Sequence, residues 1–135
     1  MVVDASAIIS MLAREPDADE LADVLGKAVR RLAPTSAIWE SVVGLTLQYA
    51  MAVSTARQNV SDFVQVAGIE VSAIGEIELE FALDAYEIFG KGRHPARLNM
   101  GDCFVYALAK TKGAALLHKD NGFWLTDLKQ ARTRA

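Results

Sequence analysis

Short apolar runs alternate along the chain with longer stretches in which apolar residues recur every three or four positions. The longer spacing is that of one face of an α-helix, and a brief continuous apolar run is typical of a buried strand. Caps and breakers bound these segments: Asn99 precedes one helical stretch and Gly113 ends it. The pattern predicts helices over residues 5–12, 17–32, 35–53, 55–67, 77–89 and 100–112, and strands over 1–4, 31–34, 69–71 and 114–118.

The order of these elements predicts the fold class. Helices that alternate with short apolar strands favour an α/β fold, in which helices cover a parallel sheet. The 135 residues suffice for one domain, which we expect to span residues 1–135. In open parallel sheets, ligands bind outside the carboxyl ends of the strands. The residues that follow each strand are therefore the first candidates for a functional site.

Composition narrows the setting of the chain. Cys103 is the one cysteine, so the chain has no partner for an internal disulfide, and we expect a reducing cytoplasm. Hydrophobic residues make up 52% of the chain, but no run approaches the ~18 uninterrupted apolar residues of a membrane span. We therefore expect no membrane association. The net charge of −3 does not by itself indicate a nucleic-acid binder.

Basic residues are nevertheless concentrated in two places. Lys91, Arg93, His94 and Arg97 lie in a loop that contains glycine and proline. Beside an acidic metal site, such a cluster could hold the phosphates of RNA, and we expect Arg93, His94 and Arg97 to do so. The alternative is a solvated loop. The tail from about residue 129 is also basic, and we predict that it frays.

Four acidic residues lie where strands end or helices begin: Asp4, Glu40, Asp102 and Asp120. In a parallel sheet all four can meet at one edge. Gathered carboxylates repel each other unless a cation lies among them. Oxygen ligands suit Mg²⁺ or Mn²⁺, and a metal held by carboxylates is suited to the hydrolysis of phosphodiesters. The acids therefore predict a metal-dependent hydrolytic site.

Each acid also has a purely structural interpretation. Asp4 could cap the following helix with the help of Ser6, and Asp102 is favoured in a first helical turn by the helix dipole. Glu40 could occupy the surface of an amphipathic helix. Asp120 belongs to the segment Lys-Asp-Asn-Gly, whose composition is common in plain turns.

Other catalytic motifs are missing from the sequence. There is no phosphate-binding glycine-rich loop, nucleophile elbow or dinucleotide fingerprint, and His94 and His118 lack metal-ligand spacing with Cys103. A phosphotransfer or phosphatase domain would need a second acid at Ser6 or an acid pair before Asp4. A catalytically silent binding module is the other alternative. Three aromatic residues are predicted to pack in the core rather than to stack on bases: Phe81, Tyr86 and Phe89.

Four segments carry a family resemblance. They are Met-Val-Val-Asp-Ala-Ser-Ala-Ile-Ile around Asp4, Ser-Ala-Ile-Trp-Glu ending at Glu40, Arg-His-Pro-Ala-Arg-Leu-Asn-Met-Gly-Asp-Cys-Phe-Val-Tyr-Ala-Leu-Ala-Lys around Asp102, and Leu-Leu-His-Lys-Asp-Asn-Gly-Phe around Asp120. Together these segments resemble PIN-domain ribonucleases, and most closely the VapC-type toxins of bacterial toxin–antitoxin pairs. The resemblance covers nearly the whole chain.

The resemblance implies a PIN-like α/β/α sandwich with a small central parallel sheet, and a Mg²⁺- or Mn²⁺-dependent endoribonuclease. Asp4 and Asp102 match the principal metal-binding aspartates, Glu40 matches the acid carried on a helix, and Asp120 matches the fourth acid. The last motif departs from the family, whose relatives often have Gly-Asp-Asp or Gly-Asn-Asp where this chain has Asp-Asn-Gly. Asp127 is therefore the alternative fourth acid.

The resemblance also implies partners and a mechanism. We expect Asp4 and Asp102 to bind the ion directly, and Glu40 and Asp120 to complete its surroundings through water or a second ion. A bound water then attacks the phosphate in line, without a side-chain nucleophile. A VapB-type antitoxin is expected in a groove formed by the helices of the first half of the chain, and the toxin is expected to be a homodimer.

Overall fold

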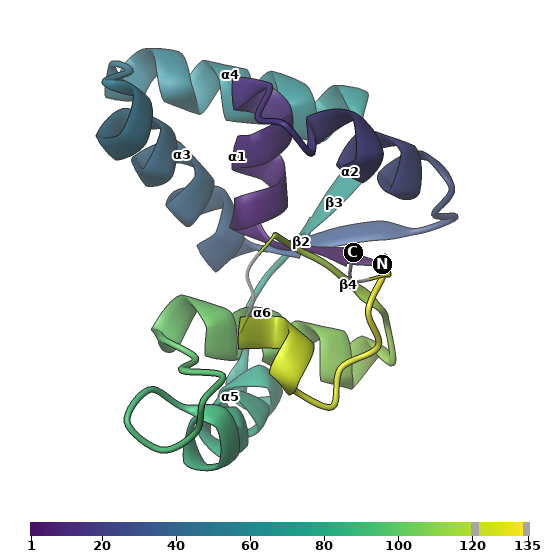
Figure 1. The fold of residues 1–135 in the computed structure, drawn as a ribbon. Helices are drawn as coiled ribbons and strands as arrows, with labels where there is room; N and C mark the ends of the chain where they lie inside the picture. The colour runs from purple at the N-terminus through teal and green to yellow at the C-terminus, as the bar shows by residue number, and fades with distance from the viewer. Residues whose placement is uncertain (120–121, 134–135) are drawn as a thin grey trace.

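A four-stranded parallel sheet lies at the centre of the molecule, with helices on both faces (Figure 1). The computed structural model describes residues 1–119 and 122–133. The strands are β1 (Val2–Val3), β2 (Arg31–Pro34), β3 (Ile69–Ser72) and β4 (Leu116–Leu117), arranged in the order β3-β2-β1-β4. The predicted α/β/α sandwich with a small parallel sheet is thereby confirmed.

The helices form two layers. One face of the sheet carries α1 (Ala5–Ala13), α2 (Ala18–Gly26), α3 (Thr35–Tyr49) and α4 (Val53–Val66), and the other carries α5 (Glu76–Phe89) and α6 (Met100–Lys112) (Figure 1). A 3₁₀ helix, Gly122–Leu125, follows β4. All six predicted helices are present in the structure.

The two central strands set the register of the sheet. Val2 of β1 lies opposite Leu32 of β2 on one side and Leu116 of β4 on the other. Val2 and Leu116 are fully buried, as expected for strands that are covered on both faces. Because all the strands are parallel, the segments that follow β1, β2 and β4 leave the sheet at the same edge. Asp4 follows β1 directly, and α3 begins where β2 ends.

Two helix boundaries differ from the sequence prediction. The helix predicted over 17–32 ends at Gly26, because residues 31–34 pair in parallel with both β1 and β3. The helix predicted over 35–53 ends at Tyr49, since Ala50 adopts a left-handed conformation with φ 54°, and α4 already begins at Val53. Apolar spacing continued across both turns, so it could not locate them.

The prediction of a frayed tail from about residue 129 was wrong for the residues described. The backbone of Leu116 donates to Lys129 O at 2.9 Å and accepts from Ala131 N at 2.9 Å, so the tail extends the sheet beside β4. Arg132 then forms ion pairs with Asp17 at 3.4 Å and Glu20 at 3.2 Å. Its charge serves to attach the tail to α2, which composition alone could not reveal.

The aromatic residues of α5 also differ from expectation. Phe81 is 37% exposed and Tyr86 48% exposed, so the prediction that they pack in the core was wrong, whereas Phe89 is half-buried against the core. The buried contacts of α5 are made by Ala82 and Ala85. Within residues 1–119 and 122–133, no helix has the length and apolar character needed to cross a membrane.

Arg31 joins the ends of two helices and generates a stability prediction. Its guanidinium donates to Gly26 O at 3.2 Å at the end of α2, to Ala28 O at 3.3 Å just after α2, and to Ala67 O at 2.6 Å just after α4. Replacement of Arg31 by Met leaves three carbonyls without this donor. We expect the free energy of unfolding in urea to fall by about 1.5–3 kcal/mol with an unchanged m-value.

The neighbouring arginine provides the matched control. Arg30 pairs with Glu70 at 3.2 Å, but the two side chains are 61% and 58% exposed. Such surface pairs contribute roughly 0–1 kcal/mol, so Arg30→Met should change the unfolding free energy much less. Equal losses in the two variants would contradict the role assigned to Arg31.

Candidate active site

Asp4 lies at the carboxyl end of β1 and is 6% exposed. Its Oδ2 accepts hydrogen bonds from Ser6 N at 3.0 Å and Ser6 Oγ at 2.5 Å, which makes it the N-cap of α1. Ser6 Oγ in turn accepts from Lys119 N at 2.9 Å, just beyond β4. The orientation of the Asp4 carboxylate is therefore fixed from two adjacent strands.

Glu40 lies in the second turn of α3, and its carboxylate rests against Gly101 in the first turn of α6. A Cβ atom built on Gly101 would overlap all three terminal atoms of the Glu40 side chain. The missing side chain at position 101 therefore lets α6 approach α3 closely enough for the Glu40 carboxylate to occupy the space between them.

Asp102 lies in the first turn of α6 and forms a capping box with Asn99. Asp102 N donates to Asn99 Oδ1 at 2.9 Å, and Asn99 N donates to Asp102 Oδ2 at 3.0 Å. This reciprocal pair is a common start for a helix. It also fixes one oxygen of the Asp102 carboxylate at the edge of the sheet where Asp4 lies.

Asp4, Glu40 and Asp102 line one cavity of about 350 Å³ at this edge. Burial and, secondly, the negative charge of Asp4 raise the pKa of Glu40 to about 7. Glu40 therefore changes its charge near neutral pH. Within residues 1–119 and 122–133, no three His, Cys, Asp or Glu side chains are gathered tightly enough to form a preformed metal site.

Comparison with known proteins places the chain in a family. Residues 1–127 match the family model of the PIN domain. The chain belongs to the PIN-domain family. It is 34% identical over 128 residues to Ribonuclease VapC of Mycolicibacterium smegmatis, an alignment that covers 95% of this chain and 97% of the relative. It is 40% identical over 136 residues to Ribonuclease VapC28 of Mycobacterium tuberculosis, with 99% of each chain covered.

A solved structure has the same fold. The crystal structure of Mycobacterium tuberculosis VapC20, described as a sarcin–ricin loop cleaving toxin, superposes on this PIN domain with a TM-score of 0.75. The match covers 98% of each chain. At 15% sequence identity, this likeness concerns the fold alone.

Asp120 and Asp127 are the two candidates for the fourth acid of the PIN domain, and the structure describes only Asp127. Asp120 lies outside the described residues. Asp127 accepts hydrogen bonds from Tyr106 Oη at 2.7 Å and Lys110 Nζ at 2.8 Å. Lys110 lies eight residues beyond Asp102 on α6, about 12 Å along the helix. Asp127 is thus bound to the middle and far end of α6, and these partners give it a structural role.

The three predicted phosphate-binding residues lie in the loop between α5 and α6. Arg93 lies over the ring of Tyr86 at 5.4 Å. His94 Nδ1 accepts from Ala96 N at 3.0 Å, and the His94 ring packs edge-on against Phe89 with centroids 5.1 Å apart. Arg97 is exposed and has φ 54°. The loop leads into α6 along the chain, and these residues lie outside the set that lines the cavity of Asp102.

Sequence analysis missed two residues that shape the site. Trp39 precedes Glu40, lines the same cavity and is 67% exposed. Gly101 provides the space for Glu40. The signal for Trp39 was its position directly before Glu40, which was used only as part of a family motif. Nothing in the sequence around Gly101 distinguishes a close helix contact from an ordinary first turn.

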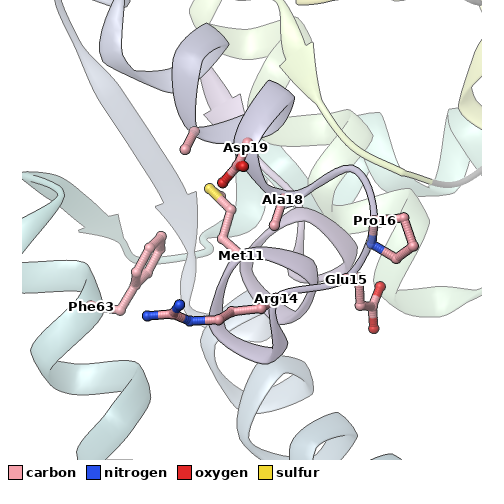
Figure 2. Close-up of a pocket in the computed structure, with 8 residues that line it drawn as sticks. Met11, Arg14, Glu15, Pro16, Ala18, Asp19 and Phe63 are labelled. Carbon is pink, nitrogen blue, oxygen red and sulfur yellow. The ribbon is translucent and has the colours of Figure 1, made fainter.

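A second cavity lies away from the acids. It measures about 470 Å³ and is formed by the C-terminal end of α1, the start of α2 and α4 (Figure 2). Met11 and Phe63 supply apolar surface, and the guanidinium of Arg14 extends toward Phe63 (Figure 2). Asp19 contributes a carboxylate to the same cavity.

The pKa of Glu40 provides a direct test of the geometry around the acids. We expect carboxyl NMR of the metal-free chain to show Glu40 titrating at about pH 7. Asp4→Asn should lower this pKa, because it removes the charge of Asp4. The pKa should still stay above the ordinary value of 4.5, because burial is the larger cause.

A remote acid is the control for this titration. Asp62 lies on α4 and accepts from Gln58 at 2.7 Å. Asp62→Asn should leave the titration of Glu40 unchanged. A Glu40 pKa that does not respond to Asp4→Asn would contradict the proximity of the two carboxylates.

Proposed function

We propose that this PIN domain is a metal-dependent endoribonuclease that acts as the toxin of a toxin–antitoxin pair. The observation that carries the proposal is the convergence of Asp4, Glu40 and Asp102 on one cavity at the carboxyl edge of the sheet. Relatives at 34–40% identity over nearly the full chain are named VapC ribonucleases, which supports RNA as the substrate. The products are expected to be shorter RNA chains.

The chemistry of the cavity supports Mg²⁺ or Mn²⁺ as the cofactor. Its ionisable lining residues, among those described, are three carboxylates, and hard divalent cations prefer oxygen ligands. The charge of Asp4 disfavours ionised Glu40, so a cation among them would lower the electrostatic free energy. Asp4 and Asp102 would hold the ion, and Glu40 would complete its surroundings through water. The position of Asp120 in this set is a proposal as well.

The chain's own residues have distinct parts in the proposed hydrolysis. Ser6 and Asn99 fix the orientation of Asp4 and Asp102, respectively, through the hydrogen bonds described above. Glu40, with a pKa close to working pH, accepts the proton of the attacking water at its carboxylate. A bound Mg²⁺ or Mn²⁺ supplies Lewis acidity toward a phosphoryl oxygen and lowers the pKa of a coordinated water. Arg93, Arg97 and His94 bind flanking phosphates of the RNA.

The second cavity is the proposed anchor for a VapB-type antitoxin. Its apolar surface, provided by Met11 and Phe63, suits an apolar side chain of the partner. Arg14 supplies a cation for an acidic partner group, beside the carboxylates of Glu15 and Asp19. This places the antitoxin on α1, α2 and α4, the helices of the first half of the chain. The proposed location is the cytoplasm, which agrees with one buried free thiol, Cys103.

A homodimer is the proposed assembly, and α5 is its proposed contact. Beside its buried residues Ala82 and Ala85, α5 exposes Ile77, Phe81 and Ile88. Their spacing of four and seven residues places these three side chains on one face of the helix. Exposed apolar surface of this kind marks protein contacts. Because α5 lies on the face opposite to α1–α4, this dimer leaves the second cavity accessible.

Replacement of the two central aspartates tests the proposed reaction. We expect Asp4→Asn and Asp102→Asn each to lower RNA cleavage in Mg²⁺ or Mn²⁺ by at least about a hundredfold, and to weaken Mn²⁺ binding measured by calorimetry. Asparagine can still accept the capping hydrogen bonds of either aspartate, so the fold should persist in circular dichroism.

The fourth-acid alternative provides the control for cleavage. Asp127→Asn removes a charge from the partners Tyr106 and Lys110, so we expect lower thermal stability but cleavage within about threefold of the parent. Retained activity in both Asp4→Asn and Asp102→Asn would end the proposal. A loss of activity in Asp127→Asn with an intact fold would instead assign the fourth acid to this residue.

Reversal of the charge in the second cavity tests the antitoxin anchor. We expect Arg14→Glu to weaken the complex with the co-expressed antitoxin about tenfold or more, because a charge pair becomes repulsive, while cleavage by the free chain is unchanged. Affinity can be measured by calorimetry. Lys27→Glu is the control, since Lys27 is exposed at the end of α2 and carries the same charge. Equal effects of the two variants would show general charge dependence rather than a local anchor.

A further inference from the structure

The cavity lined by Asp4, Glu40 and Asp102 adjoins another hollow, which has a different chemistry. This Trp39 hollow measures about 440 Å³ and is lined by Ser36, Trp39, Glu40, Asn99, Met100, Gly101 and Phe104. It shares Trp39, Glu40 and Asn99 with the cavity of the acids. A ligand that extends from a phosphate at the acids would therefore enter the Trp39 hollow next.

The surface of the Trp39 hollow suits a flat, neutral group. Its lining is mostly apolar, and Glu40 is its one ionisable group among the described residues. Trp39 is 67% exposed and Met100 is 78% exposed at its mouth, and such exposure of large apolar side chains needs a reason beyond packing. Every nucleobase has a π-face that stacks on aromatic side chains. A phosphate would find an acid and no cation here, whereas a base would find aromatic and thioether surface.

We propose that the Trp39 hollow is a nucleobase subsite, which holds the unpaired base of the nucleotide next to the cleaved phosphate. This inference rests on the ribonuclease function proposed above and names the surface that contacts a base of its substrate. In a duplex, the bases are stacked inside and cannot enter a side hollow, so only a splayed nucleotide fits. Trp39 then acts as the stacking residue of this subsite, one position before the acid Glu40.

A third hollow and two cations lie next to the Trp39 hollow, on the side away from the acids. Beyond Met100 and Phe104 lies a third hollow of about 570 Å³, which Tyr86 and Lys91 also line. The Lys91 ammonium and the Arg93 guanidinium over Tyr86 place cations at this far end, where the next phosphate of an extended strand would lie. In an extended strand the base projects sideways from a ribose that lies between two phosphates, so a base in the Trp39 hollow leaves one flanking phosphate for the acids and the other for these cations.

A second copy of the chain is the competing occupant. A protein surface that filled the Trp39 hollow would also cover Glu40, which lines it, and would close one side of the acid cavity. The flank of α5 with Ile77, Phe81 and Ile88 offers a dimer contact without this conflict. Continuity with the acids therefore favours the nucleotide.

The two tryptophans of the sequence allow a readout that does not need cleavage. Trp124 packs on the ring of His118 at 4.8 Å, and Trp124→Phe leaves Trp39 as the sole fluorophore of its kind. We expect oligoadenylate to quench Trp39 emission in this variant. A ribose-phosphate strand of equal length without bases should not quench it.

Kinetics provide the second readout. Trp39→Ala should raise KM for a cleaved single-stranded RNA about tenfold with little change in kcat, because base stacking is worth about 1–3 kcal/mol. Trp39→Phe should restore most of the affinity. Val66→Ala, at an 89% exposed position on α4, is the matched control and should leave both constants unchanged.

The outcomes separate this inference from the proposed function. Cleavage that is intact while Trp39 is neither quenched nor required would overturn the base subsite alone. If the parent protein cuts no RNA in Mg²⁺ or Mn²⁺, the ribonuclease proposal fails and the quenching experiment decides whether the hollow still binds bases. If Trp39→Ala converts a dimer to a monomer in sedimentation, the hollow is a contact between copies and the inference is overturned.

Discussion

The burial of neighbouring carboxylates, with the repulsion between Asp4 and Glu40 added to it, is the constraint on which the carboxyl edge of the sheet depends. Asp4 is buried and Glu40 is half-buried, and burial, together with the charge of Asp4, raises the pKa of Glu40 to about 7. Ser6 fixes the orientation of Asp4, and the missing side chain of Gly101 leaves the space that the Glu40 carboxylate occupies. The chain therefore maintains an arrangement that costs stability in the absence of a cation. Such costs are typical of functional sites, where the surrounding core holds an unfavourable geometry in place.

The structure explains how so much negative charge is tolerated at one edge. Asp4 is the N-cap of α1, and Asp102 lies in the first turn of α6. The amino ends of both helices therefore face the acids, and the positive end of a helix dipole stabilises a nearby carboxylate by about 0.3–1 kcal/mol. The capping and functional interpretations of these residues are thus compatible, because the hydrogen bonds that start each helix also aim its acid at the common cavity.

The sequence alone predicted the fold class and the six α-helices of the described residues, because apolar spacing directly records which face each segment buries; the 3₁₀ helix Gly122–Leu125 was not predicted. Turn positions were less accessible: the left-handed Ala50 carries no glycine signal, and the end of α2 at Gly26 depends on the pairing of residues 31–34 with two other strands. The candidate acids could be chosen because residues after parallel strands meet at one edge. Gly101 and the exposure of Trp39 depend on the distance between α3 and α6, which is a tertiary property that no local pattern encodes.

Close packing of small residues accounts for the apolar surface of the second layer. Ala82 and Ala85 form the buried contacts of α5, so α5 lies near α6 and its larger apolar side chains are left outside. The chain thus contains more large hydrophobic residues than its core buries. This excess could not be assigned to core or surface from composition, which is why Phe81 and Tyr86 were misplaced.

The helix α1 connects the acids with the second cavity. Asp4 caps its first turn, and Arg14 follows its last residue; ten residues of helix separate the two by about 15 Å. An extended peptide covers that distance with about five residues. A partner segment anchored between Met11 and Phe63 (Figure 2) could therefore reach the carboxylates with a short extension. The length of α1 therefore makes the proposed anchor and a contact with the acids geometrically compatible within one partner segment.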